Sequence, residues 1–116
     1  MITLYGIPNC DTIKKAKKWL ESNDVAYRFH DFRKDGLTQE QLTNWANELG
    51  WETLLNKRGT TWRQQPDDVK NTINEASAIT LMLEHPAMIK RPVLDTGATR
   101  KVGFKDTEYA ALLLNN

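Results

Sequence analysis

The order of the expected strands and helices constrains the fold of this chain more than any other feature. Residues 2–5 alternate and are rich in strand-forming side chains, and residues 25–32 carry a second stretch of strand formers. Between them, residues 11–22 hold apolar side chains within one arc of a helix. A strand, a helix and a strand in this order imply a parallel strand pair joined by a right-handed crossover.

The rest of the chain is expected to add several helices and then a hairpin. A capping box at Thr38 begins the first of these helices, and Ser77 is expected to cap a later one. No convincing strand is predicted in this middle part. Residues 92–104 predict a β-hairpin. Asp106 is expected to cap a final helix that turns Tyr109, Leu112 and Leu113 inward. Only about four strands are then available, so they must share one sheet with helices on its faces.

Length and charge narrow the class of protein. A chain of 116 residues suits one domain with a single hydrophobic core. Sixteen Lys and Arg residues against fifteen Asp and Glu give a net charge of +1, which argues against a general nucleic-acid binder. The longest apolar run, residues 110–114, is too short to span a membrane, and the first residues lack the layout of a signal peptide. We therefore expect a cytoplasmic protein that binds neither nucleic acid nor membranes.

The chain has one cysteine, Cys10, and therefore cannot form an intrachain disulfide. Cys10 follows the first strand and a tight loop, at the start of the first helix, where the helix dipole and unpaired backbone N–H groups stabilise a thiolate. Lys14, one turn further, lies on the same side of the helix, whereas Lys15 and Lys18 indicate a solvated face. This position favours a reactive thiol over a small buried hydrophobe, and any partner sulfur must come from another molecule.

Other kinds of chemistry find less support in the sequence. His30 and His85 are far apart, and one cysteine does not build a zinc site by the usual spacings, so no metal site is predicted. A Cys–His pair for acyl transfer stays an open alternative, because its members need only be neighbours in space. Residues 56–65 indicate an ordinary polar surface loop on which Trp62 could be exposed.

Four runs of residues carry motifs in a fixed order. They are GIPNCDTIKKA at residues 6–16, LLNKRGTTWR at 54–63, IKRPVL at 89–94 and VGF at 102–104. In these runs and their spacing, the chain resembles the arsenate reductase (ArsC) family of the glutathione-dependent type. Within that family it most resembles the Spx/YffB branch, and the likeness covers essentially the whole chain.

The resemblance implies an α/β fold that agrees with the order of elements above. It implies a thioredoxin-like, glutaredoxin-related β-α-β…β-β-α core with a four-stranded mixed sheet, formed by residues of about 1–33 and 90–116. A helical subdomain of about 34–89 would be inserted into this single ArsC-like domain, residues 1–116.

The resemblance also implies which residues form the site. Cys10 would be the redox cysteine, and Pro92 a cis proline that faces it and shapes the site. Arg91, beside Pro92, would hold a carboxylate or oxyanion with its planar fork of donors. The residues expected to bind glutathione or substrate are Asn9, Thr12, Lys14, Asn56, Arg58 and Arg91.

Two departures from the family's pattern narrow the expected function. Arsenate reductases of this type surround the cysteine with three arginines. Arg91 matches one, whereas Asn56 stands at the second position and the third falls near Gly103. Spx-type regulators usually carry a second cysteine three positions after the first, where this chain has Ile13. Both departures favour a thiol reductase with a single cysteine.

The leading interpretation is therefore a glutathione-dependent thiol–disulfide oxidoreductase in which Cys10 attacks and glutathione, as co-substrate, resolves the product. No metal and no tightly bound cofactor is expected, and the substrate would be a small-molecule or protein thiol or disulfide. A first alternative is true arsenate reduction. A second, of another class, is an Spx-like regulator that binds RNA polymerase, a partner that the sequence does not favour.

Overall fold

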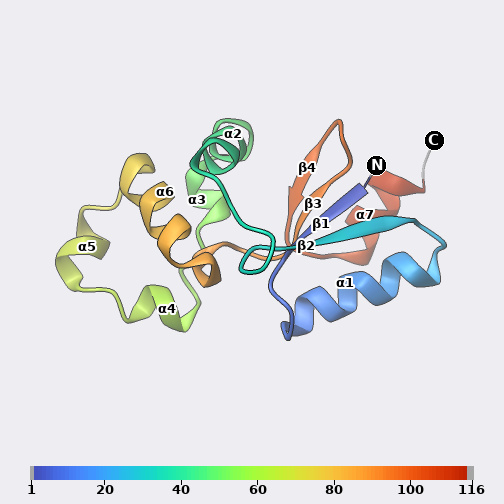
Figure 1. Ribbon diagram of the computed structural model, residues 1–116, viewed down its shortest axis with the longest axis horizontal. Helices are drawn as coiled ribbons and strands as arrows, with labels where there is room; N and C mark the ends of the chain where they lie inside the picture. The colour runs from blue at the N-terminus through green and yellow to red at the C-terminus, as the bar shows by residue number, and fades with distance from the viewer. Residues whose placement is uncertain (1, 115–116) are drawn as a thin grey trace. The chain divides into compact units, whose positions relative to one another are not determined.

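The computed structural model describes residues 2–114, which form two compact units (Figure 1). One unit joins the residues up to Phe32 to those from Arg91 onward, and the other spans Arg33–Lys90. The first unit contains the sheet and the second is helical.

The sheet has four strands in the order β2-β1-β3-β4. β1 (Ile2–Gly6) lies beside β2 (Tyr27–Asp31) in parallel, which confirms the strand pair expected at the start of the chain. β3 (Val93–Asp95) pairs with β1 in antiparallel fashion and continues into a hairpin with β4 (Arg100–Val102). The mixed four-stranded sheet of the predicted α/β fold is thereby confirmed.

Two helices cover the same face of this sheet. α1 (Asp11–Ser22) and α7 (Asp106–Leu113) meet there in one hydrophobic core. Leu4 of β1 and Leu94 of β3 are register partners, so both side chains point to this face. The five fully buried members of the core are Leu4, Ala16, Leu20, Leu94 and Tyr109.

The second unit is built from short helices. Thr38 caps the first of them, accepting a hydrogen bond from Gln41 N at 3.1 Å, as its capping-box pattern predicted. An isolated antiparallel bridge between Leu55 and Ile89 ties the residue that follows α3 to the last residues of the unit. Its helices are α2 (Gln39–Leu49), α3 (Trp51–Leu54), α4 (Thr60–Arg63), α5 (Asp67–Asn71), α6 (Glu75–Glu84) and the 3₁₀ helix η1 (Pro86–Met88).

Asp106 does not cap α7. It is the first residue of the helix, and the N-cap is Lys105, which makes no side-chain capping hydrogen bond.

Three further local expectations are wrong. Asn74, not Ser77, caps α6, because the Asn74 carboxamide accepts from Ser77 N while the Ser77 hydroxyl accepts from Asn74 N, both at 3.0 Å. Trp62 is buried at 8% exposure, since residues 60–63 form a helical turn that turns its large ring inward. Leu112 is 38% exposed, because α7 turns only a narrow stripe around Tyr109 toward the core.

An aromatic cluster closes the core of the first unit. The ring of Tyr109 meets Trp19 and Phe104 edge to face, with centroid distances of 5.7 and 4.7 Å. Tyr109 is fully buried, and its hydroxyl has no hydrogen-bond partner among the described residues. Burial therefore raises the pKa of Tyr109 far above its usual range, and the unpaired hydroxyl costs stability.

We expect Tyr109→Phe to raise the free energy of unfolding by about 1 kcal/mol, because it removes a buried polar group that has no partner. Urea denaturation measures this change. Tyr27→Phe is the matched control, since the Tyr27 hydroxyl donates to Glu21 at 2.7 Å, and it should lower the free energy by about 0.5–1 kcal/mol. A loss of stability in Tyr109→Phe as large as that of the control would show that the hydroxyl is bonded after all.

Candidate active site

The end of β1 and the start of α1 form the first half of the candidate site. The loop after Gly6 turns on Asn9, whose φ of 66° lies in the left-handed region that asparagine tolerates better than most residues. Cys10 follows as the N-cap of α1, with extended backbone angles of −106° and 128°. The expected position of the cysteine, at the beginning of the first helix, is confirmed.

The first turn of α1 lies close to β1 because Gly6 has no side chain. A Cβ at this position would collide with Cδ1 of Ile13 and would lie 3.1 Å from its Cγ1. Ile13 is 1% exposed, so its side chain fills the space over Gly6. The carbonyl oxygen of Gly6 also accepts from Phe32 N at 2.9 Å, which extends the pairing with β2. This packing fixes the helix start, and Cys10 with it, on the sheet.

Cys10 is half-buried, and its thiol is not part of a disulfide. The Cys10 side chain makes no capping hydrogen bond, while its carbonyl oxygen accepts from Lys14 N at 3.0 Å. Cys10 stands at the N-terminus of α1, where the N–H groups of the first turn lack intrahelical partners and the helix dipole is positive. Lys14 is exposed and has no ion-pair partner among the described residues, whereas the exposed carboxylate of Asp11 offsets part of this positive potential.

The start of β3 supplies the second half. The Arg91–Pro92 peptide bond is cis, the configuration that the resemblance implied. Val93 pairs with Tyr5 in antiparallel register. Arg91 and Pro92 precede Val93 in the chain, so they lie at the end of the sheet where β1 finishes. The carbonyl oxygen of Pro92 accepts from Gly103 N at 2.9 Å, and the φ of 83° at Gly103 favours glycine there. Arg91 is half-buried and Pro92 is buried.

The first unit therefore gathers most of the expected site residues at one end of its sheet. That they bind glutathione or substrate stays a prediction. The expected site residues at this end are Asn9, Cys10, Thr12, Lys14, Arg91 and Pro92.

Asn56 and Arg58 belong to the helical unit. Asn56 N donates to Met88 O at 2.8 Å, and the Asn56 carboxamide oxygen accepts from Arg58 N at 3.1 Å, so the carboxamide holds the turn that presents Arg58. The side chain of Arg58 is exposed. The participation of these two residues in the site stays a prediction.

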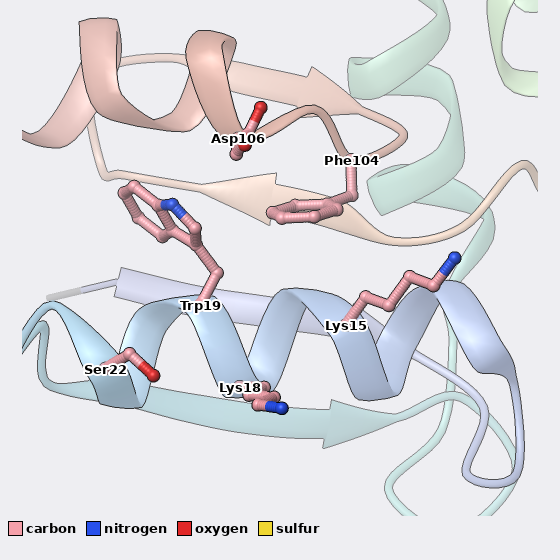
Figure 2. Close-up of a pocket in the computed structure, with 6 residues that line it drawn as sticks. All are labelled: Lys15, Lys18, Trp19, Ser22, Phe104 and Asp106. Carbon is pink, nitrogen blue, oxygen red and sulfur yellow. The ribbon is translucent and has the colours of Figure 1, made fainter.

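The sequence-based reasoning missed a groove along α1 in the first unit (Figure 2). Helical periodicity assigned Trp19 to the core, yet Trp19 is only half-buried and contributes to this groove. Periodicity gives the side of a helix that faces the sheet, but not how far the neighbouring chain covers its margin. A tryptophan next to exposed lysines on one helix is the signal that could have pointed to it.

Two further features of residues 2–114 concern metal binding and membranes. No group of three or more His, Cys, Asp or Glu side chains is placed to hold a metal ion in this range. No helix within it has the length and apolar character needed to cross a membrane.

Comparisons with known proteins relate nearly the whole chain to one family. A family model described as the ArsC family matches residues 5–112. A protein of Haemophilus influenzae described as uncharacterized is 44% identical over 111 residues, which are 96% of this chain and 97% of that protein. The global transcriptional regulator Spx of Streptococcus agalactiae is 29% identical over 115 residues, 97% of this chain and 83% of the regulator.

Solved structures give the same fold. A YFFB protein superposes with a TM-score of 0.93 at 50% identity, covering 97% of this chain and 99% of the other. An arsenate reductase (ArsC) related protein from Brucella melitensis gives a TM-score of 0.80 at 49% identity, covering 95% and 92%. These likenesses confirm the thioredoxin-like fold and the Spx/YffB branch that the motifs indicated.

We expect Gly6→Ala to lower the free energy of unfolding by about 1–3 kcal/mol, because the new methyl group pushes Ile13 and the start of α1 away from β1. Urea denaturation measures the loss.

The control is the same substitution in an Ile13→Val background, which lacks the Cδ1 atom of the collision. The cost of Gly6→Ala should be smaller there, because the two sites are coupled. An equal cost in both backgrounds would contradict the packing that we assign to this pair.

Proposed function

This chain is a member of the ArsC family, and from that premise we propose that it is a glutathione-dependent thiol–disulfide oxidoreductase. The observation that carries the proposal is the free, half-buried thiol of Cys10 at the first turn of α1, without a capping hydrogen bond. A thiolate there is stabilised by the helix N-terminus and stays open to attack an outside sulfur.

The proposed reaction has two steps. The Cys10 thiolate attacks the glutathione sulfur of a mixed disulfide, forms a Cys10–glutathione disulfide and releases the substrate as its thiolate, which takes up a proton. A second glutathione thiolate then attacks the glutathione sulfur of this adduct. The second step restores the Cys10 thiolate and leaves oxidised glutathione. One glutathione is oxidised for each substrate thiol set free, and no sulfur of this chain other than that of Cys10 takes part.

The neighbours of Cys10 would bind and orient the glutathione. Arg91 and Lys14 carry cationic groups at the same end of the sheet and are suited to its carboxylates. Asn9 and Thr12 add polar side chains on either side of Cys10, and buried Pro92 shapes the wall beside it. A role for Asn56 and Arg58, which belong to the helical unit, stays a prediction.

The cellular setting follows from the same proposal. Glutathione is abundant in reducing cytosols, so we also propose a cytoplasmic location. The substrate would be a small-molecule or protein disulfide, and the protein would use neither a metal nor a tightly bound cofactor.

Regulation of transcription is the second candidate, because the Streptococcus agalactiae relative is a global transcriptional regulator. In that case the chain would bind RNA polymerase through its surface and would not need the thiol. A pull-down with polymerase separates the two functions. Tight binding that Cys10→Ser leaves unchanged would favour the regulator, and its absence favours the enzyme.

We expect oxidised glutathione at neutral pH to form an adduct on Cys10, which reduced glutathione then removes. Mass spectrometry of the intact chain detects both steps, and Cys10→Ser is the control that should form no adduct. Failure of the wild-type chain to form the adduct would overturn the enzyme proposal.

We expect Arg91→Ala to raise the KM for glutathione about tenfold, because a charge-assisted contact to a carboxylate is lost, and Arg91→Lys to raise it less. Arg28→Ala, at an exposed position on β2, is the control. An unchanged KM for glutathione in Arg91→Ala would remove Arg91 from the site.

A parallel assay with arsenate tests the remaining alternative. We expect much faster turnover of the disulfide, since Asn56 stands where the resemblance places a second arginine, and the third falls near Gly103. Faster reduction of arsenate than of disulfides would identify an arsenate reductase.

A further inference from the structure

The groove along α1 lies within the unit that contains the sheet and has a volume of about 300 Å³. Figure 2 shows it between α1 and the segment that leads from β4 into α7. The groove is open to solvent along the helix. Its lining residues are Lys15, Lys18, Trp19, Ser22, Phe104 and Asp106.

The floor of the groove is aromatic and held in place from below. Trp19 and Phe104 are both half-buried, and each meets the fully buried ring of Tyr109 edge to face at 88°. Figure 2 shows the indole nitrogen of Trp19 on the edge of the ring that faces Phe104. This N–H has no hydrogen-bond partner among the described residues. The floor thus offers two fixed apolar surfaces and one available donor.

The lining of the groove carries two lysines against one carboxylate and is therefore positive on balance. Lys15 and Lys18 are exposed, and neither forms an ion pair with another described residue. Asp106 is the one acidic side chain of the lining. Its carboxylate accepts a hydrogen bond from Thr107 N at 2.8 Å, within the first turn of α7. An occupant with negative charge is favoured, and a basic one is repelled by both ammonium groups.

We propose that this groove is a docking site for an acidic segment of a partner protein, one that inserts an aromatic side chain between Trp19 and Phe104. The inserted ring stacks on the aromatic floor, and flanking carboxylates meet Lys15 and Lys18. From Lys15 to Ser22 the helix rises about 10 Å, the length of three extended residues. An open trough of that length fits a peptide better than a small molecule, which proteins enclose over most of its surface.

The test is a titration of 15N-labelled Cys10→Ser protein with the capped peptide acetyl-Glu-Asp-Phe-Asp-Glu-amide. The use of Cys10→Ser keeps docking separate from thiol chemistry, so the two proposals fail or succeed independently. We expect the indole N–H signal of Trp19 to shift in a saturable way, with an affinity that falls as salt is raised. Two matched peptides, one with Gln and Asn in place of the acids and one with Ala in place of Phe, should bind more weakly.

Variants of the rim supply the control. Lys15→Gln combined with Lys18→Gln should weaken binding about fivefold, because two partly exposed ion pairs are lost. Both side chains are exposed, so the fold should be unaffected, and Arg28→Gln on β2 should bind like the parent.

Three outcomes would overturn the proposal. They are an unshifted Trp19 signal at millimolar peptide, equal binding of the acidic and the uncharged peptide, and phenylacetate binding as tightly as the acidic peptide. Self-association of the chain that the lysine variant abolishes would likewise assign the groove to a second copy.

Discussion

The packing of Ile13 against Gly6 is the contact on which the candidate site depends. α1 cannot approach the end of β1 this closely unless the strand position beneath Ile13 lacks a side chain. The approach sets where the helix begins, and Cys10 is the residue immediately before it. The reactivity proposed for the sulfur therefore originates in a steric fact of the core, since the helix N-terminus acts on the thiol only if the two are fixed together.

The pairing of β1 with β3 provides the second constraint. It brings residues more than 80 positions apart in the sequence to the same end of the sheet, because Tyr5 and Val93 are register partners. Everything between Arg33 and Lys90 forms a compact unit of its own, so the sheet-bearing unit completes its core with the two ends of the chain. A helical segment of this size is compatible with the sheet because both of its connections, at Phe32 and Arg91, lie where strands end or begin.

Sequence patterns predicted the elements that have strong periodicity or specific caps. The apolar arc of α1, the Thr38 cap and the hairpin around Gly97 are local properties of the chain, and all three are observed. Trp62 and Trp19 could not be placed in the same way. Burial of Trp62 depends on a four-residue helix too short for any period, and the exposure of Trp19 depends on how far Phe104 and α7 cover α1.

The same distinction between local pattern and tertiary packing applies to the residues of the candidate site. Cys10 at a helix start follows from the order of elements, whereas its placement at the same end of the sheet as Arg91 and Pro92 follows only from the register of strands far apart in the sequence. The family resemblance supplied that second relation, because a motif records tertiary contacts that spacing alone does not. The unpaired lysines beside the aromatic floor lay outside any motif, and only the packed structure shows them together.

Ile13 connects the packing of the core with the presence of a single cysteine in the chain. A two-cysteine switch would need a sulfur three residues after Cys10, where Ile13 is 1% exposed and fills the space over Gly6. The side chain that anchors the helix thus occupies the place that a resolving thiol would take. Because the chain has no other cysteine, the proposed mixed disulfide on Cys10 has to be resolved from outside. The proposed dependence on an external thiol is thus consistent with how α1 is held on the sheet.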